Sequence, residues 1–347
     1  MSTTDSGQRA YIGSFTSAGG RGIVTAAVDA RTGALTPLHA TDEVPDPSYL
    51  APTPDGRHLY AVSETSDGAA AAFTLTENGP VPLGVPVPVR GAGPTHLTLW
   101  AGHLLTANYT SGSVSALPVR ADGTLAEPAA VLRHEGGGPH PGRQEGPHAH
   151  AVLPDPSGRR LLSVDLGTDS VRVCELAPAT GVPAVRHEVR LRPGSGPRHL
   201  AFHPRGDHAY VINELSSTVT PCRWDAATGT LTPLAETAIV PPGTDDNHPS
   251  ELVVSPDGRF AWAANRGHDS ISVLAVDPSG ENLSLVTTVP CGGHWPRDLA
   301  LHPGGRHLYA ANERSGDVTW FSVDTATGVP EAGGSIEVPA ASCVVFA

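Results

Sequence analysis

Short apolar runs, each ended by a turn that contains Gly or Pro, follow one another along the whole chain. The stretch 196–219, GPRHLAFHPRGDHAYVINELSSTV, is typical, with apolar runs from His199 to Phe202 and from Ala209 to Asn213 on either side of a Pro-Arg-Gly turn. Two such runs joined by a tight turn predict a β-hairpin. The outer ends of an antiparallel hairpin lie side by side, so we expect Arg198 and Glu214 at one edge.

The proline of this turn recurs roughly every 50 residues, a period typical of β-propeller blades. One unit, 93–109 (GPTHLTLWAGHLLTANY), has Ala101-Gly102 as its turn instead. The other units place the proline at Pro54, Pro156, Pro204, Pro256 and Pro303.

A second series of turns gives an independent count of blades. Each unit continues into another hairpin with a Gly turn such as ATG or DG, which favours tight connections between strands. These glycines number seven: Gly33, Gly79, Gly123, Gly181, Gly229, Gly280 and Gly328.

The ends of the chain agree with seven blades. The last apolar run, SCVVFA from Ser342, reads as a first strand, whereas the N-terminus begins with a second strand, since Tyr11 falls where Tyr60 and Tyr210 fall. We therefore predict an all-β fold, a single seven-bladed β-propeller domain over residues 1–347. Its ring is closed by the C-terminal inner strand, which joins the N-terminal strands and removes an exposed sheet edge.

Composition narrows the class of protein. The 39 Gly and 34 Pro residues fall at regular intervals, which indicates turns rather than disorder, and the net charge of −13 argues against a nucleic-acid partner. No apolar stretch is long enough to span a membrane, and MSTTDSGQRA does not resemble a signal peptide. Since the cysteines lie far apart, we expect a cytoplasmic protein with buried reduced thiols, namely Cys174, Cys222, Cys291 and Cys343.

One rim of the propeller is expected to carry the chemistry. If the strands of a blade are called a to d from the inside out, the a–b and c–d turns are short and repetitive, while the b–c and d–a connections are longer and varied. Function usually lies on variable loops held by a rigid scaffold. The polar residues at the start of strand a and the end of strand b on this rim should meet at the mouth of the central channel: His150, Arg198, Glu214, Arg266 and Arg297.

Three arginines, a histidine and a glutamate at one pocket fit a small anionic ligand, since guanidinium forks match carboxylate and phosphate oxygens. A His or a Glu can also move a proton. Other interpretations remain open: Arg198 and Glu214 could be an ion pair that joins blades, and Arg266 could cap a turn. The loop 133–149 contains His134, Glu135, His140, His148 and His150 and could bind metal, but its spacing fits no standard ligand motif, so we expect no metal and no cofactor.

Four further histidines are expected at the opposite rim, exposed to solvent: His58, His103, His208 and His307.

The same motifs resemble a known family. GPRHLAFHP with VINELSSTV, ELVVSPDGRFAWAANRGHDSISV and PRDLALHPGGRHLYAANERSGDV resemble the seven-bladed propeller lactonases, whose branches include bacterial 6-phosphogluconolactonases and fungal 3-carboxy-cis,cis-muconate lactonizing enzymes. The resemblance covers essentially the whole chain. It implies the same polar set, His150, Arg198, Glu214, Arg266 and Arg297, with His148 as an alternative to His150.

The resemblance implies a lactonase that hydrolyses a sugar-acid lactone such as 6-phosphogluconolactone to its open acid, a step of the pentose phosphate pathway. His150, Arg198 and Glu214 would be catalytic: His150 or Glu214 takes a proton from water, and Arg198 stabilises the oxyanion. His148, Arg266 and Arg297 would bind the substrate.

The sequence is also compatible with two functions other than a lactonase. One is a carboxymuconate-type cycloisomerase. The other is a non-catalytic binding platform, which would need exposed aromatic side chains such as Trp295 and Tyr109. The oligomeric state is left open.

Overall fold

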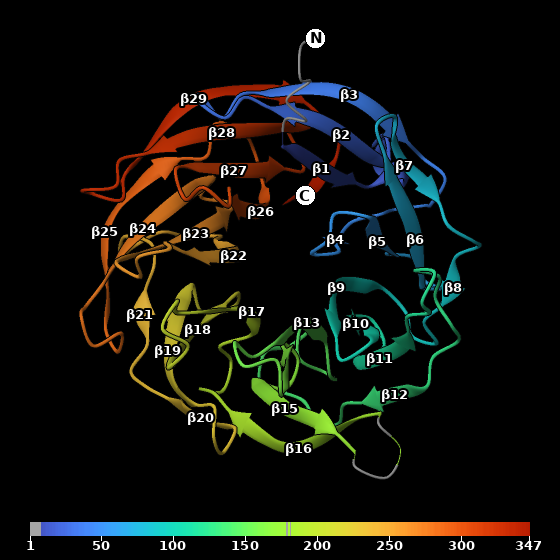
Figure 1. The fold of residues 1–347 in the computed structure, drawn as a ribbon. Helices are drawn as coiled ribbons and strands as arrows, with labels where there is room; N and C mark the ends of the chain where they lie inside the picture. The colour runs from blue at the N-terminus through green and yellow to red at the C-terminus, as the bar shows by residue number, and fades with distance from the viewer. Residues whose placement is uncertain (1–7, 178–179, 181) are drawn as a thin grey trace.

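Seven antiparallel sheets stand in a ring in the computed structural model, which describes residues 8–177, 180 and 182–347 (Figure 1). This confirms the all-β fold and the seven-bladed propeller. In every blade the first strand lies innermost and the chain runs outward by hairpins, except in the blade that closes the ring. The seven inner strands are β4 (Leu50–Pro52), β9 (Pro94–Trp100), β13 (Ala149–Pro154), β17 (Pro197–Phe202), β22 (His248–Val254), β26 (Pro296–Leu301) and β30 (Ala341–Phe346).

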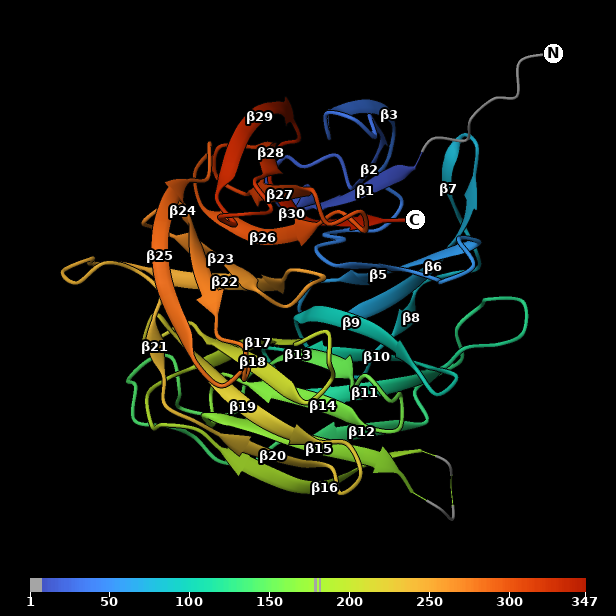
Figure 2. The same cartoon turned by 60° about the vertical axis from the view of Figure 1, so that its left-hand side comes forward.

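The outer strands follow in chain order, and β16 and β25 are seen at the outer edge of their blades in Figure 2. Two short strands, β8 (Val87–Pro88) and β21 (Thr237–Ala238), add to the sheets by pairing with β6 and β19. The remaining strands of blades one to six are β5 (His58–Ser63), β6 (Ala69–Thr76), β7 (Gly79–Pro82), β10 (His103–Asn108), β11 (Ser113–Pro118), β12 (Ala130–Arg133), β14 (Leu161–Asp165), β15 (Ser170–Leu176), β16 (Pro183–Arg190), β18 (His208–Asn213), β19 (Thr218–Asp225), β20 (Thr230–Pro233), β23 (Phe260–Arg266), β24 (Ser270–Val276), β25 (Leu283–Pro290), β27 (His307–Asn312), β28 (Asp317–Val323) and β29 (Pro330–Glu337).

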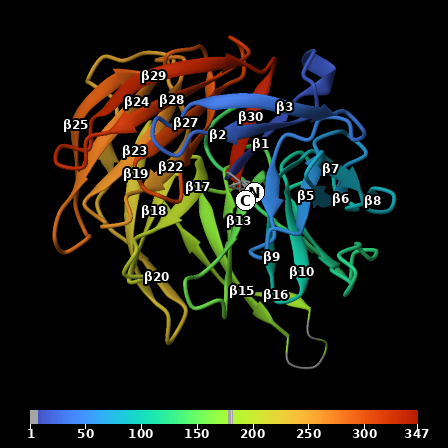
Figure 3. The same cartoon turned by 45° about the horizontal axis from the view of Figure 1, so that its top comes forward.

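The seventh blade joins the two ends of the chain, as predicted. The C-terminal strand β30 pairs with β1 (Arg9–Ser14), which continues into β2 (Ile23–Val28) and β3 (Leu35–Thr41) (Figure 3). Cys343 lies opposite Gly13 in this pairing. A side chain at Gly13 would place its Cβ 2.3 Å from the Pro47 carbonyl oxygen, so only glycine fits where the ring closes.

Both series of turns form the predicted connections. At the a–b turn of the fourth blade, for example, the His203 backbone N–H donates to the His208 carbonyl. The glycines of the c–d turns adopt positive φ, from 72° at Gly33 to 96° at Gly79, which L side chains rarely adopt. Gly181 lies outside the described residues.

Hydrogen bonds from strand b to the next c–d turn join neighbouring blades. The Tyr210 hydroxyl donates to the Gly280 carbonyl at 3.0 Å, and Tyr60, Tyr309 and Trp262 make the equivalent bond to the carbonyls of Gly123, Gly33 and Gly328. The c–d turns therefore tie each of these blades to its neighbour as well as ending a hairpin.

The four histidines expected to be exposed at this rim are not: His58 and His103 are half-buried, and the other two are buried. His208 and His307 are 7% and 6% exposed, because the c–d glycines Gly280 and Gly33 pack against their rings. A glycine turn leaves room for a ring, and the sequence pattern does not reveal this contact between blades.

The apolar core lies between adjacent blades. Leu162 and Val164 of one blade pack with Val211 and Trp224 of the next, and similar clusters fill the other interfaces. All four cysteines are buried and unbonded, as predicted. The only helix among the described residues is the short 3-10 turn η1 (Thr16–Ala18), which is too short to cross a membrane.

Candidate active site

An extra residue interrupts the pairing of the inner strand in six blades. In β17, Pro197 pairs with Asn213 and His199 pairs with Ile212, which leaves Arg198 without a partner between them. Such a β-bulge bends the strand and re-aims its side chains, and bulges are frequent beside active sites. The irregularities fall at Thr95, His150, Arg198, Ser250 with Glu251, Arg297 and Ser342.

Four of these bulged residues lie together at one mouth of the channel. A small cavity there is lined by the bulged residues Thr95, Arg198, Arg297 and Ser342, together with Ser48, the equivalent residue of the first blade. Arg198 and Arg297, both predicted at the mouth, therefore line the same cavity.

Glu214 is the centre of the polar cluster at the mouth. It follows β18 and is 4% exposed. Its Oε1 lies 2.5 Å from Arg143 Nη2, and its Oε2 lies 2.7 Å from Arg266 Nη2 and 3.3 Å from Arg198 Nε. The Arg198 contact lacks hydrogen-bond geometry at Nε, so it is an ionic contact only. We call these four residues the Glu214 cluster.

The Glu214 cluster carries a formal charge of +2, from three guanidiniums and one carboxylate. Burial raises the pKa of Glu214, but the charges of Arg266, Arg198 and Arg143 outweigh it and hold that pKa well below its ordinary value. Burial and the neighbouring Arg266 lower the pKa of Arg198 to about 9. The cluster therefore holds an ionised Glu214 and retains an excess of positive charge, which an anionic ligand would compensate.

His150 lies beside this cluster as a neutral base. It is 5% exposed, and its Nδ1 is buried without a hydrogen-bond partner. Burial, and after it the charge of Arg198, hold the pKa of His150 well below its ordinary value. An uncharged imidazole can accept a proton, and this one faces the arginines that would hold an anionic substrate.

His148 has a different environment from His150. Its ring stacks on Tyr109 with centroids 4.4 Å apart, and its Nδ1 lies 2.9 Å from the Tyr109 carbonyl oxygen. The ring of Tyr109 in turn meets His150 edge-on at 5.5 Å. His148 therefore packs behind Tyr109, while His150 occupies the inner strand.

Arg297 has partners of its own. Its Nη2 lies 3.2 Å from Glu64 and its Nη1 lies 3.3 Å from Glu313. Burial lowers the pKa of Arg297, but the charges of Glu64 and Glu313 together outweigh it and hold that pKa above its ordinary value. The five predicted residues thus share the mouth, but Arg297 contacts two glutamates from the ends of strands b rather than Glu214.

The long loop 133–149 covers the mouth and supplies Arg143, which sequence reasoning missed. Arg143 is the only loop residue in the Glu214 cluster, and its half-buried side chain also lies 3.5 Å from the Tyr109 hydroxyl. The sequence did contain a signal for Arg143, because it is a cation in the longest connection and that connection overhangs the predicted anion site. The loop histidines have separate partners, since His134 Nδ1 lies 2.6 Å from Asp165 and His140 Nδ1 contacts the Pro141 carbonyl.

No group of three or more His, Cys, Asp or Glu side chains in the described part of the chain is arranged to hold a metal ion.

Tyr109 and Trp295, the two aromatic candidates for a binding platform, both pack against side chains at the mouth. Trp295 is half-buried, and the guanidiniums of Arg266 and Arg314 lie 5.6 and 3.4 Å from its ring centroid. Its φ of 64° is unusual for a bulky residue, and such strain often accompanies functional sites. Trp295 therefore forms part of the wall around the Glu214 cluster.

A second polar layer lies directly below the arginines and was also missed. We call it the inner layer; it consists of Tyr49, His96, His199, Glu251 and Asp298. Strict alternation along a strand places consecutive side chains on opposite faces, so a regular strand would bring only alternate residues to the channel. The bulge allows two consecutive residues, such as Arg198 and His199, to line it.

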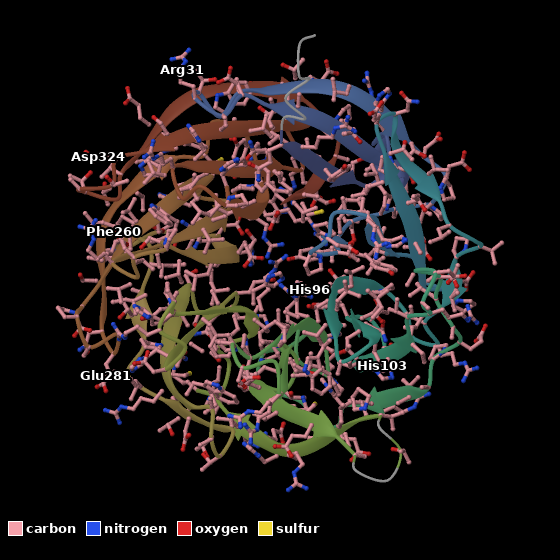
Figure 4. All side chains as sticks on the ribbon, viewed as in Figure 1. Arg31, His96, His103, Phe260, Glu281 and Asp324 are labelled. Atoms are coloured by element: carbon pink, nitrogen blue, oxygen red, sulfur yellow. The ribbon has the colours of Figure 1, made fainter. Side chains whose placement is uncertain are left out.

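The inner layer forms the floor of a cavity of ≈ 480 Å³ whose walls are apolar residues of the inner strands. Figure 4 shows His96 near the centre of the ring, whereas Arg31, Phe260, Glu281 and Asp324 lie at its periphery. Tyr49, His199 and Asp298 line both this cavity and the small one at the mouth, so they separate the two ends of the channel.

Comparison with known proteins agrees with this architecture. A family model described as "Lactonase, 7-bladed beta-propeller" matches residues 9–346. The 6-phosphogluconolactonase of Bacillus subtilis is 34% identical over 345 residues, 97% of either chain. That of Formosa agariphila is 30% identical over 92% of this chain and 93% of its own.

A solved structure is equally similar. The periplasmic gluconolactonase PpgL of Pseudomonas aeruginosa superposes with a TM-score of 0.92 at 32% identity, over 98% of either chain. Family model, relatives and fold therefore agree, and the chain belongs to the seven-bladed β-propeller lactonase family.

Proposed function

We propose that this chain hydrolyses the lactone of a sugar acid, with 6-phosphogluconolactone, opened to 6-phosphogluconate, as its first candidate substrate. The observation that carries the proposal is the Glu214 cluster, where three guanidiniums surround one carboxylate beside a neutral His150. The relatives that bear the name 6-phosphogluconolactonase support it. With this substrate, the reaction is the lactone-opening step of the pentose phosphate pathway.

We assign the role of general base to His150. Water attacks the ring carbonyl carbon while His150 takes a proton from it, and that proton then goes to the ring oxygen as its bond to the carbonyl carbon breaks. Glu214 is the poorer base, because the charges of Arg266, Arg198 and Arg143 strongly stabilise its ionised form. Its role in this proposal is to orient Arg198 and Arg266.

Arg198 and Arg297 are assigned to the oxyanion. The cavity that they share leaves ≈ 10 Å³ for the centre of a water molecule, enough for a single oxygen atom. Donors fixed around the position where negative charge develops stabilise the transition state. The small cavity is therefore suited to the carbonyl oxygen of the lactone.

Arg143 and Arg266 are assigned to the anionic group of the substrate. Both belong to the Glu214 cluster with its excess charge, and Arg143 comes from the loop that covers the mouth. Arg297 is already compensated by Glu64 and Glu313, which makes it a weaker choice for a phosphate than the sequence motif suggests. His148 supports Tyr109 at the side of the site.

We also place the reaction in the cytoplasm. The four buried thiols suit a reducing compartment, although the Pseudomonas aeruginosa relative is named a periplasmic gluconolactonase.

A substrate panel tests the proposal. Purified protein is assayed with 6-phosphogluconolactone, unphosphorylated gluconolactone and 3-carboxy-cis,cis-muconate, each corrected for the rate without protein. We expect the phosphorylated lactone to have the highest kcat/KM, by about tenfold or more over the unphosphorylated one, since each charged hydrogen bond to phosphate contributes about 1.5–3 kcal/mol. Cyclisation of the muconate without any lactone hydrolysis would instead establish the cycloisomerase.

A further inference from the structure

A chain of titratable groups leads from His150 to the far end of the channel. The rings of His150 and His199 meet edge-on with centroids 5.1 Å apart, and His150 Nδ1 has no hydrogen-bond partner of its own, so a proton would pass between the rings after a small rotation or through one water. His199 Nδ1 contacts Glu251 Oε2 directly, and Glu251 Oε1 accepts the Leu252 backbone N–H at 2.9 Å. Glu251 lines the floor of the ≈ 480 Å³ cavity on the side away from the arginines.

The charges of the two layers favour movement of a proton in this direction. The mouth holds the guanidiniums of Arg143, Arg198, Arg266 and Arg297, which repel a proton, whereas the inner layer holds two carboxylic groups. A substrate bound under the loop 133–149 would also occupy the mouth. A proton produced beside His150 therefore meets less opposition through the inner layer than through the mouth.

We infer that His199 and Glu251 carry the proton released by lactone hydrolysis from His150 to the cavity at the opposite end of the channel. The inference rests on the proposed function, because opening a lactone to a carboxylate at neutral pH releases one proton per turnover. Nothing in the proposed ring opening itself uses the inner layer. His199 and Glu251 are thus relay residues that act through His150.

Each transfer conserves protons. Ring opening leaves His150 neutral, and the carboxylic acid of the opened product then gives its O–H proton to His150. Glu251 loses its own O–H proton to water in the cavity. Protonated His150 passes an N–H proton to His199, and His199 passes the proton on Nδ1 to Glu251 Oε2, which restores the starting state. Only N–H and O–H bonds form and break, and one proton enters the relay for each proton that leaves it.

The environment of the relay makes both groups suitable. Burial raises the pKa of Glu251 to about 7, although the backbone N–H of Leu252 and the charge of Arg198 oppose it. Burial holds the pKa of His199 well below its ordinary value, so the pair is a neutral hydrogen bond and not an ion pair. The other titratable groups that face Glu251 are Asp298 and Tyr49.

The test is the buffer dependence of kcat. In weakly buffered solution near pH 7, Glu251→Gln should lower kcat for 6-phosphogluconolactone by about tenfold, less than the loss expected for a general base itself. KM should stay unchanged. Imidazole can enter the open cavity and should restore the rate of the variant, while the wild type should be insensitive to it. Glu251→Asp, which keeps the acid, should retain most of the activity.

A matched control is Glu236→Gln, a partly buried carboxylate paired with Arg192 in the outer part of the fourth blade, which should behave as the wild type. If Glu251→Gln keeps the wild-type rate at low buffer, the relay is refuted. If it is slow but does not respond to imidazole, its defect is structural and the relay is again refuted. Failure of the wild type on every lactone would instead overturn the proposed function.

Discussion

At the scale of single residues, the candidate site is a set of charges that compensate one another only in part. Glu214 is surrounded by three guanidiniums, while Arg297 faces two carboxylates, Glu64 and Glu313. Buried ion pairs are costly to break, because the partner that remains is left charged and desolvated. The central carboxylate should therefore matter for stability as well as for activity.

Replacing this carboxylate tests that conclusion. Glu214→Gln leaves Arg143, Arg198 and Arg266 without their shared counter-charge, so we expect the free energy of unfolding near pH 7 to fall by about 3–5 kcal/mol. Denaturant unfolding measures the change. The pKa of Glu214 is lower in the folded state than its ordinary value of 4.5, so the stability that Glu214 contributes is lost as the pH falls below about 4.5. The Glu214→Gln variant should not show this loss of stability in acid. An unfolding free energy equal to the wild type's would show that the cluster is not coupled.

The inner layer predicts the opposite pH dependence. Burial raises the pKa values of Glu251 and Asp298 to about 7, above their ordinary 4.5 and 3.8. The folded state therefore binds more protons than the unfolded chain in this window, and its stability should fall as pH rises from about 4.5 to about 7. In the double variant Glu251→Gln with Asp298→Asn, the fall in unfolding free energy between about pH 5 and about pH 8 should be smaller than in the wild type by on the order of 1–3 kcal/mol. Parallel slopes in denaturant unfolding would contradict the assignment.

At the scale of strands and turns, the blades are held in register by contacts that repeat around the ring. The hydroxyls of Tyr60, Tyr210 and Tyr309 each donate to the carbonyl of a c–d turn in the next blade. At the inner strands, the bulges determine which side chains reach the channel. The same repeat thus supplies rigid blade contacts on one rim and re-aimed side chains on the other.

The blade contacts can be measured one at a time. Tyr210→Phe removes a buried donor and leaves the Gly280 carbonyl unsatisfied, which should cost about 1–3 kcal/mol of stability. Since Tyr210 points to the rim opposite the Glu214 cluster, kcat and KM should not change. Tyr60→Phe and Tyr309→Phe are matched repeats at other interfaces, and their effects should add. A change in kcat with no change in stability would mean that the two rims are coupled.

Much of this architecture could be predicted from the sequence, because its signals are local. Turn prolines, c–d glycines and the final SCVVFA strand repeat at regular intervals, so blade number and ring closure followed. The position of Arg198 and Arg297 at the mouth followed from the same spacing. The contact of Arg143 with Glu214, the place of Glu251 at the channel and the ion pairs of Arg297 could not be predicted, because they depend on the path of a long loop, on bulges and on contacts between distant blades.

At the scale of the whole molecule, a single strand determines whether the ring is closed. Ala341, Cys343 and Val344 of β30 are buried between β1 and the neighbouring blades. Without β30, both β1 and the adjacent interface would be exposed to water. Closure by strands from the two ends of the chain makes folding of the last blade dependent on the entire ring.

Truncation tests the closure. Deletion of residues 340–347 should remove most of the net stability, because a domain is typically stable by only about 5–15 kcal/mol. Thermal melting of the truncated chain should begin at a markedly lower temperature than that of the full chain. Ala347→Gly, which changes only the exposed end of the chain, is the control and should melt like the wild type. Identical melting of the truncated and full chains would contradict the closure.

The central claim is that neutral His150, beside the Glu214 cluster, opens a lactone. Its most direct measurement is the steady-state hydrolysis of 6-phosphogluconolactone by the wild type and by His150→Gln, each corrected for spontaneous ring opening. Loss of a general base predicts a fall in kcat of about 10²–10⁴-fold, with KM nearly unchanged because Arg143 and Arg266 still hold the substrate. A His150→Gln variant that is folded and as fast as the wild type would contradict the account.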